Sequence, residues 1–164
     1  MSTYQYWGVY LALLYVLQTS FLPRLAFHDI SPDLMLLAVI SLGLLKGARI
    51  GVLIGFACGM LESLANGTFF GVDIFNRMLI GFVCGKISDQ VFKDQFLLPV
   101  TASLFATVFN YFLWAALLTL MGHGFDYVEH AKYVLLPMLG FQLLFAYPVH
   151  RATYLLDQWL AFKK

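Results

Sequence analysis

The sequence predicts an all-α membrane protein, a helical bundle with about six transmembrane helices. Of its 164 residues, 61% are hydrophobic and 12% are charged, whereas about 25% are charged in a typical soluble domain. The long apolar segments lack the alternating pattern that a membrane β-barrel requires, so helices must satisfy the backbone hydrogen bonds within the lipid. Five glycines spaced four residues apart also indicate helices that pack closely in a bilayer. They are Gly43, Gly47, Gly51, Gly55 and Gly59.

Six apolar segments are candidate spans, because about 20 apolar residues cross the hydrocarbon core. They are residues 4–22, 34–46, 50–64, 72–87, 96–121 and 134–159. The second and third are short, but one continuous helix through both would place Lys46 and Arg49 near the bilayer centre. That placement costs about 2.5–3.5 kcal/mol for each charge. We therefore predict two helices joined by a tight turn, within one transmembrane domain that covers residues 1–164.

The basic residues are distributed unevenly between the two sides of this predicted bundle. The side that holds both termini carries Lys46, Arg49, Lys86, Lys93, Arg151, Lys163 and Lys164. The other side carries only Arg24 and Lys132, with Arg77 inside the fourth span. Since lysine and arginine accumulate in cytoplasmic loops, both termini are expected in the cytoplasm. The basic residues form no patch of the kind that binds phosphate groups, so nucleic acid is not an expected partner.

The glycines indicate where helices approach one another. Positions four residues apart advance about 40° beyond a full turn, so five glycines do not share one narrow face of a straight helix. We expect the two short helices to carry part of the glycine surface each, facing Gly81 and Gly85 on the fourth span. Packing within one chain is favoured over a dimer contact for these glycines.

Polar groups near the spans are candidates for an intramembrane polar cluster, because such groups are costly in lipid without a partner. Glu62, Asp73 and Arg77 are the main candidates. Asp73 and Arg77 are one helical turn apart, which favours simple neutralisation of the arginine over a ligand or proton site. Asn76 and Asn110 can join this cluster or hydrogen-bond to neighbouring helices.

Motifs for catalysis and metal binding are missing from the sequence. It has no nucleophile elbow, zinc-protease motif or phosphate-binding loop, and its histidines are spread over opposite ends of the predicted bundle. We therefore predict no catalytic residue, no metal site, no cofactor and no enzymatic activity.

Residues 30–87 carry a set of short motifs that resembles one protein family. The motifs are the run Pro32-Asp33-Leu34, the glycines Gly51, Gly55 and Gly59, and the spaced Gly67 and Gly71. Together with the length and the charged turn, they resemble the rod shape-determining protein MreD family. In one departure, the acid is Glu62, whereas family members often place an aspartate at the position of Ser63.

The resemblance implies a non-enzymatic scaffold subunit of the cell-elongation machinery (the elongasome) in the bacterial inner membrane. It would bind MreC and, through it, MreB, RodA and a peptidoglycan transpeptidase, and would support rod shape and lateral peptidoglycan synthesis. We expect a lateral or outer groove to receive the transmembrane helix of MreC.

The same family is similar, in its six-helix arrangement, to the substrate-binding subunits of energy-coupling-factor transporters. The alternative function is therefore a membrane subunit for uptake of a small molecule such as a vitamin. Its pocket would face outward among Glu62, Asp73, Arg77 and Asn110. A channel is disfavoured because no span shows a repeated polar stripe.

Overall fold

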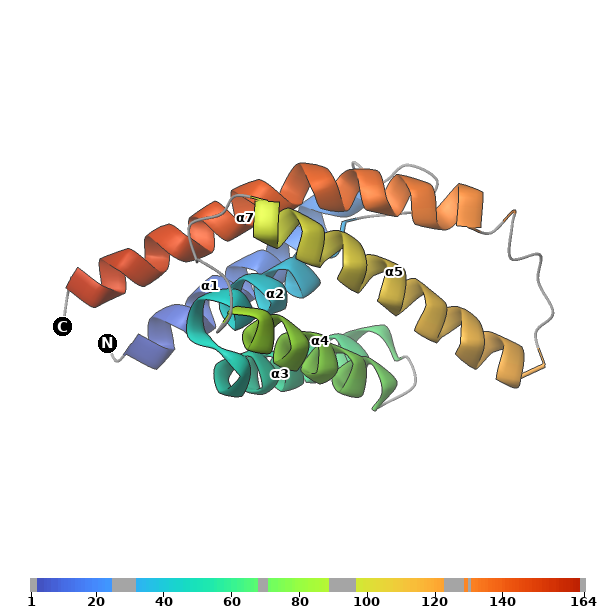
Figure 1. Cartoon of the computed structure of the whole chain (residues 1–164), viewed down its shortest axis with the longest axis horizontal. Helices are drawn as coiled ribbons and strands as arrows, with labels where there is room; N and C mark the ends of the chain where they lie inside the picture. Colours follow the sequence, from blue (N-terminus) through green and yellow to red (C-terminus); the bar gives the residue numbers. More distant parts are fainter. Residues whose placement is uncertain are drawn as a thin grey trace.

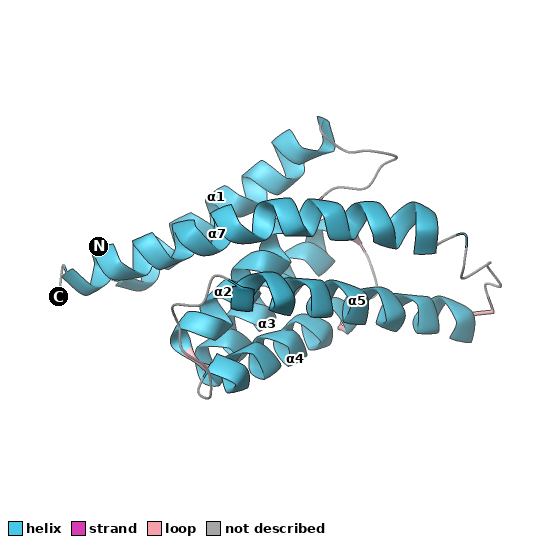
Figure 2. Ribbon diagram, turned by 45° about the horizontal axis from the view of Figure 1, so that its top comes forward, coloured by secondary structure: helices cyan, strands magenta, loops and turns pink. Residues whose placement is uncertain are grey.

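The described part of the chain is helical throughout its regular structure (Figures 1 and 2). The structure is a computed structural model that describes residues 3–24, 32–67, 71–88, 97–122, 129 and 131–162. Within these ranges the six predicted helical segments are all present. The predicted all-α bundle is thus confirmed.

The first helical segment runs without a break from α1 (Thr3–Val16) through the π-helical turn η1 (Leu17–Phe21) and the 3₁₀ turn η2 (Leu22–Arg24). It lies against the last helix, where the hydroxyl groups of Tyr10 and Thr153 hydrogen-bond at 2.8 Å. The N-terminus and the C-terminus lie at the same end of the molecule (Figure 1), which we call the termini end. The opposite end is called the far end.

Two short helices follow, α2 (Leu34–Lys46) and α3 (Ala48–Asn66), joined by Gly47 alone. Gly47 has a positive φ of 86°, a backbone conformation that glycine adopts without steric penalty. The predicted division of this region into two helices with a tight turn is confirmed. Lys46, the last residue of α2, forms an ion pair with Asp157 and lies over the ring of Trp7, which places the turn at the termini end.

Helix α2 is the centre of the bundle. All twelve of its residues from Leu34 to Leu45 are buried, and it contacts α1, α3, α4, α5 and α7. A helix that is hydrophobic on every side lies either in a protein core or in lipid, and α2 lies in the core because other helices surround it. Its thirteen residues extend only about 20 Å, less than the thickness of the hydrocarbon core.

The remaining helices are α4 (Val72–Ser88), α5 (Leu97–Leu120) and α7 (Leu136–Phe162), the last preceded by the π-helical turn η3 (Ala131–Leu135). Helix α4 packs mainly on α3 and α2, whereas α5 packs mainly on α7. Direct contact between α4 and α5 is slight. The bundle thus has two packed groups of helices that meet at α2.

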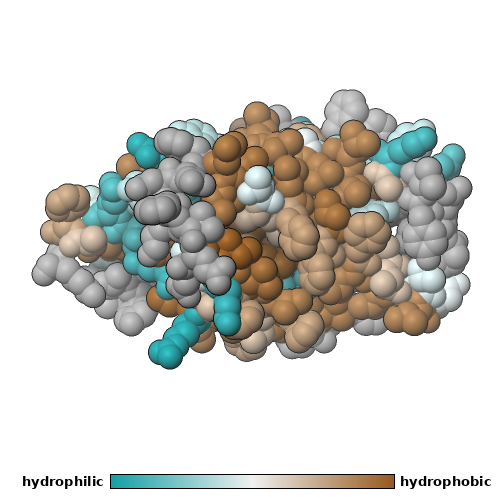
Figure 3. All heavy atoms as spheres, viewed as in Figure 1, coloured by the Kyte–Doolittle hydropathy of each residue, from teal (hydrophilic) through white to brown (hydrophobic). Residues whose placement is uncertain are grey.

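Three of the described helical segments are long and apolar enough to cross a membrane: Ala48–Ala65, Leu97–Leu120 and Ala131–Phe162. Helix α2 is apolar but shorter, so six spans remain a prediction. Large apolar side chains such as Leu53, Phe105 and Leu144 are at least two-thirds exposed. Figure 3 shows apolar side chains across the middle of one face and hydrophilic side chains toward its ends. Lipid would cover such a band, because a soluble monomer rarely exposes so much contiguous apolar surface.

Candidate functional sites: a glycine seam, a polar cavity and a lateral groove

The first candidate site is a surface of close backbone contact between α2, α3 and α4, which we call the glycine seam. It consists of Gly43, Gly51, Gly55, Gly59, Gly81 and Gly85. At each position an added Cβ atom would lie 3.0 Å or less from backbone atoms of a neighbouring segment. At five of the positions the distance is under 3.0 Å, which real Cβ atoms essentially never show, so only glycine permits that approach. At Gly43 it is 3.0 Å, which is tighter than nine in ten real Cβ contacts.

The contacts of the seam run in order along α3 and α4. Gly51 faces the backbone of Gly81, and Gly55 faces the carbonyl group of Arg77. A Cβ atom added at Gly59 would lie 2.6 Å from the Cα atom of Ile74. The two helices are therefore antiparallel neighbours along three successive turns. The glycines of this seam face one another within one chain.

The helix α2 and the turn after it complete the seam. A Cβ atom added at Gly43 would lie 3.0 Å from the carbonyl oxygen of Gly81, and Gly85 lies against the backbone of Ala48. Gly47 differs from the other predicted glycines, because an added Cβ atom would meet nothing within 4 Å. Gly47 allows the positive φ that the turn requires, and it takes no part in close packing.

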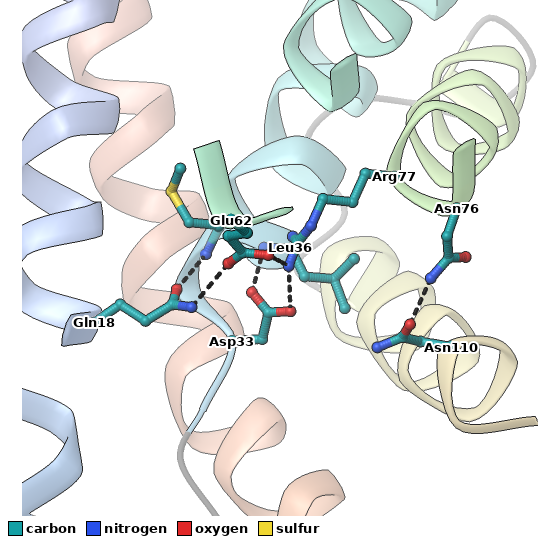
Figure 4. Close-up of polar contacts among 8 residues, drawn as sticks. Gln18, Asp33, Leu36, Glu62, Asn76, Arg77 and Asn110 are labelled. Carbon is teal, nitrogen blue, oxygen red and sulfur yellow. Dashed lines mark hydrogen bonds and ion pairs between the residues drawn. The ribbon is translucent and has the colours of Figure 1, made fainter. Parts of the chain in front are cut away.

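The second candidate site is a buried cluster of charges at the ends of α2, α3 and α4 that face away from the termini end. The guanidinium group of Arg77, on α4, forms ion pairs with Asp33 and Glu62. Its Nη2 atom lies 2.7 Å from Oδ2 of Asp33. The side chains of all three residues are largely excluded from solvent, so each charge depends on the others for compensation. The cluster therefore joins the start of α2, the end of α3 and the start of α4 (Figure 4).

One further side chain, that of Gln18, and the backbone N–H of Leu36 hold the carboxylates of this cluster in place. The amide nitrogen of Gln18 donates to Oε1 of Glu62 at 2.9 Å, and its amide oxygen accepts from the N–H of Met35 at 3.0 Å. Asp33 accepts from the N–H of Leu36 at 2.8 Å and thus caps α2 as it binds Arg77. Gln18 lies in the π-helical turn η1, a type of distortion that is frequent at functional sites.

A second polar pair lies beside the charge cluster. The amide nitrogen of Asn76 on α4 donates to the amide oxygen of Asn110 on α5 (Figure 4). This hydrogen bond joins two helices that otherwise contact each other little. Asn76 is 2% exposed, and within the described ranges its own amide oxygen has no hydrogen-bond partner.

These groups line one cavity of about 260 Å³, which we call the polar cavity. Its polar walls are Gln18, Asp33, Glu62, Asp73, Asn76, Arg77 and Asn110, and Trp114 and Met138 add apolar walls. The structure thus brings together all five residues of the predicted polar cluster. In the described part of the chain, no group of histidine, cysteine and acidic side chains is arranged to hold a metal ion.

Sequence reasoning did not assign Gln18 and Asp33 to this cluster. It connected Arg77 with Asp73, one turn away on the same helix, whereas the ion pairs come from Asp33 and Glu62 on other helices. Two features of the sequence could have identified them: Gln18 is a lone polar residue in an apolar segment, and Asp33 stands directly before an apolar helix.

The third candidate site is an apolar groove between α4 and α5, with a volume of about 450 Å³, which we call the lateral groove. Residues of both helices line it, among them Leu79, Val83, Ile87, Ala102, Phe105 and Phe109. The groove exists because α4 and α5 contact each other only slightly.

An apolar outer band around a core of short, closely packed helices, with a buried arginine compensated by two carboxylates, defines a helical membrane protein. A family model described as rod shape-determining protein MreD matches residues 2–157. The chain therefore belongs to the MreD family, as its motifs predicted. Comparisons with curated proteins and with solved structures found no match. Membership places the chain among membrane-associated proteins of rod shape determination, which are structural proteins and not a known enzyme family.

Proposed function

We propose that this protein is a non-enzymatic scaffold subunit of the bacterial elongation machinery that binds the transmembrane helix of MreC in the lateral groove. The observation that carries the proposal is the combination of an apolar groove on one face of α4 and the glycine seam on its other face. Through MreC the protein would act with MreB, RodA and a peptidoglycan transpeptidase in lateral peptidoglycan synthesis.

The shape of the lateral groove supports a helical occupant. Leu79, Val83 and Ile87 are spaced four residues apart and form a ridge along α4. Lipid tails are as apolar as these side chains, so association depends on close packing between the two helices. A rigid groove wall favours such packing, because it does not move away from the bound helix. The backbone contacts of the glycine seam hold α4 in place.

The proposed location is the inner membrane, with several spans and both termini in the cytoplasm. Both termini lie at one end of the molecule (Figure 1), and Lys46 and Arg49 lie beside the turn at that end. The arrangement agrees with the accumulation of basic residues on the cytoplasmic side. Lys93, Lys163 and Lys164, which also support this topology, lie outside the described residues.

The proposal is tested by copurification of MreC with groove variants in detergent. Val83→Trp fills the lateral groove, whereas Leu53→Trp adds the same side chain to an exposed site on α3. We expect MreC recovery to fall at least fivefold for the first variant and to stay unchanged for the second. Equal recovery with both variants, at equal levels of folded protein, would exclude the lateral groove as the MreC site.

A second candidate function is favoured by the polar cavity, which lies where a solute pocket was predicted. In this alternative the protein is the substrate-binding subunit of an uptake transporter. The cavity volume of about 260 Å³ lies below the roughly 300–1,000 Å³ of pockets for drug-sized ligands, so a vitamin would not fit without enlargement. Mass spectrometry of the purified protein tests this function, since a stoichiometric solute of vitamin size would support it.

A further inference from the structure

A second apolar groove lies between α5 and η3 at the far end, and we call it the far-end groove. Its volume is about 830 Å³. Residues of α5 from Tyr111 to Leu120 form one wall, and Ala131, Lys132 and Leu135 of η3 form the other. Helix α5 packs on α7 but contacts η3 little, so the end of α5 and the start of the η3–α7 segment lie apart (Figure 1). The groove fills the space between them.

The length of the far-end groove corresponds to one leaflet of a bilayer. Its wall on α5 extends from Tyr111 to Leu120, which is about 14 Å at 1.5 Å per residue. Half of the hydrocarbon core is about 15 Å thick. Leu120 is the last residue of α5, so the groove extends from the end of this helix toward its middle. An acyl chain of the adjacent leaflet fits this length and direction.

The walls of the groove are suited to hydrocarbon. Phe112 and Leu120 are more than three-fifths exposed, and the hydroxyl group of Thr119 donates within its own helix to the carbonyl oxygen of Ala115 at 2.8 Å. Lipid tails are as apolar as these aromatic and aliphatic side chains. A chain held between α5 and η3 gains dispersion contacts on two sides, whereas a chain on a flat helix face gains them on one.

One charged side chain lies on the groove wall, that of Lys132. It is exposed and forms no ion pair within the described ranges. Glu129, three residues earlier, is exposed and does not line the groove. Tyr133, the next residue, is 67% exposed. Lysine and tyrosine side by side at the end of a span are typical of the membrane interface, where lipid phosphate groups lie.

We propose that the far-end groove binds one acyl chain of an anionic phospholipid such as phosphatidylglycerol, with the lipid phosphate group at the ammonium group of Lys132. The single positive charge on the groove wall favours a lipid of single negative charge. A zwitterionic lipid would bring an ammonium group that meets no carboxylate on the described walls. With both termini in the cytoplasm, this lipid belongs to the leaflet away from the cytoplasm. The site is independent of MreC binding, because none of its residues lines the lateral groove.

The first experiment is native mass spectrometry of the full-length protein, washed free of lipid in detergent and then mixed with equal amounts of phosphatidylglycerol and phosphatidylethanolamine. We expect one bound phosphatidylglycerol, in about fivefold excess over phosphatidylethanolamine, because one lysine near an anionic lipid surface contributes about that factor. Equal retention of the two lipids would overturn the proposal, and so would retention of neither.

The second experiment measures variants matched in chemistry, at equal levels of folded protein. Lys132→Gln removes the charge from the groove wall and should lower phosphatidylglycerol retention about fivefold. Lys86→Gln makes the same change at an exposed position on α4, outside the groove, and should retain the lipid as the wild type does. Equal retention by the two variants would show that the lysine in the groove does not hold the phosphate group, which overturns the proposal.

A second pair of variants tests the place of the acyl chain. Ala116→Trp fills the groove next to an intact Lys132 and should lose the bound lipid, whereas Leu53→Trp at the exposed site on α3 should keep it. Equal retention by these two variants would also overturn the proposal. A photo-reactive amino acid in place of Ala116 then identifies the occupant in membranes. Crosslinking to lipid is expected, and crosslinking to a copurified protein instead would show that the groove is a protein interface and refute lipid binding there.

Discussion

Replacing Gly55 by alanine tests whether the glycine seam determines the stability of the bundle. An added Cβ atom there would lie less than 3.0 Å from the carbonyl carbon and oxygen of Arg77 and from the N–H nitrogen of Met78. Ordinary contact begins at about 3.4 Å, and all three neighbours are backbone atoms that do not rotate away. The helices α3 and α4 must therefore separate by a distance on the order of 0.5–1 Å, which weakens dispersion contacts along the whole interface.

The expected magnitude comes from a comparison with Gly140→Ala. An added Cβ atom at Gly140, within α7, would meet nothing within 4 Å. Both variants gain about 1 kcal/mol in helix propensity, so the difference between them isolates the steric effect. Overpacking costs about 1–3 kcal/mol, and we expect Gly55→Ala to be less stable than Gly140→Ala by that amount.

The assay is reversible unfolding of each variant in detergent micelles, followed by circular dichroism. Gly55→Leu extends the series and should be less stable still, because a larger side chain meets the same backbone. If both alanine variants shift the free energy of unfolding equally, the close contacts of the seam do not limit stability. The reasoning from backbone distance would then be refuted.

Three further predictions use the same unfolding assay. Arg77→Met should destabilise the protein by about 3–5 kcal/mol, because it leaves buried carboxylates without a counter-charge; a loss under 1 kcal/mol would show that the carboxylates are not charged. Asn110→Leu should cost about 1–3 kcal/mol, because Asn76 loses its one observed partner in the described part of the chain, and unchanged stability would contradict the α4–α5 bond. Lys46→Met should cost less than about 1 kcal/mol, because its ion pair with Asp157 is partly exposed. A larger loss would show that this ion pair stabilises the bundle more than an exposed pair does.

Much of the helix pattern was predictable because each boundary has a local cause. Helix α2 begins after the cap Asp33 and ends at Lys46, as predicted from the apolar run and the charge that ends it. The two-helix division around Gly47 followed from the energetic cost of burying two cations in lipid. Such causes act between near neighbours in the chain, so they can be recognised in one sequence.

The partners of Arg77 were not predictable in the same way. Asp33 lies 44 residues before it and Glu62 lies 15 residues before it, on helices whose rotation about their axes is set by contacts elsewhere. Glu62 was predicted for the same cluster as Arg77, but spacing along the chain connected the arginine with Asp73, which shares its helix. Gln18 was missed for the same reason, since nothing in the sequence around η1 shows which helix it faces.

The sequence by itself determined that the chain forms apolar helices, approximately where each of them lies along the chain, and that its glycines permit close approach. The tertiary structure alone decided which backbone each glycine meets, that α2 is enclosed by five other helices, and that carboxylates from two helices compensate one buried arginine. The physical reason is that hydrogen bonding and solvation of a helix are local, whereas its packing partner depends on how all helices fill the available space together.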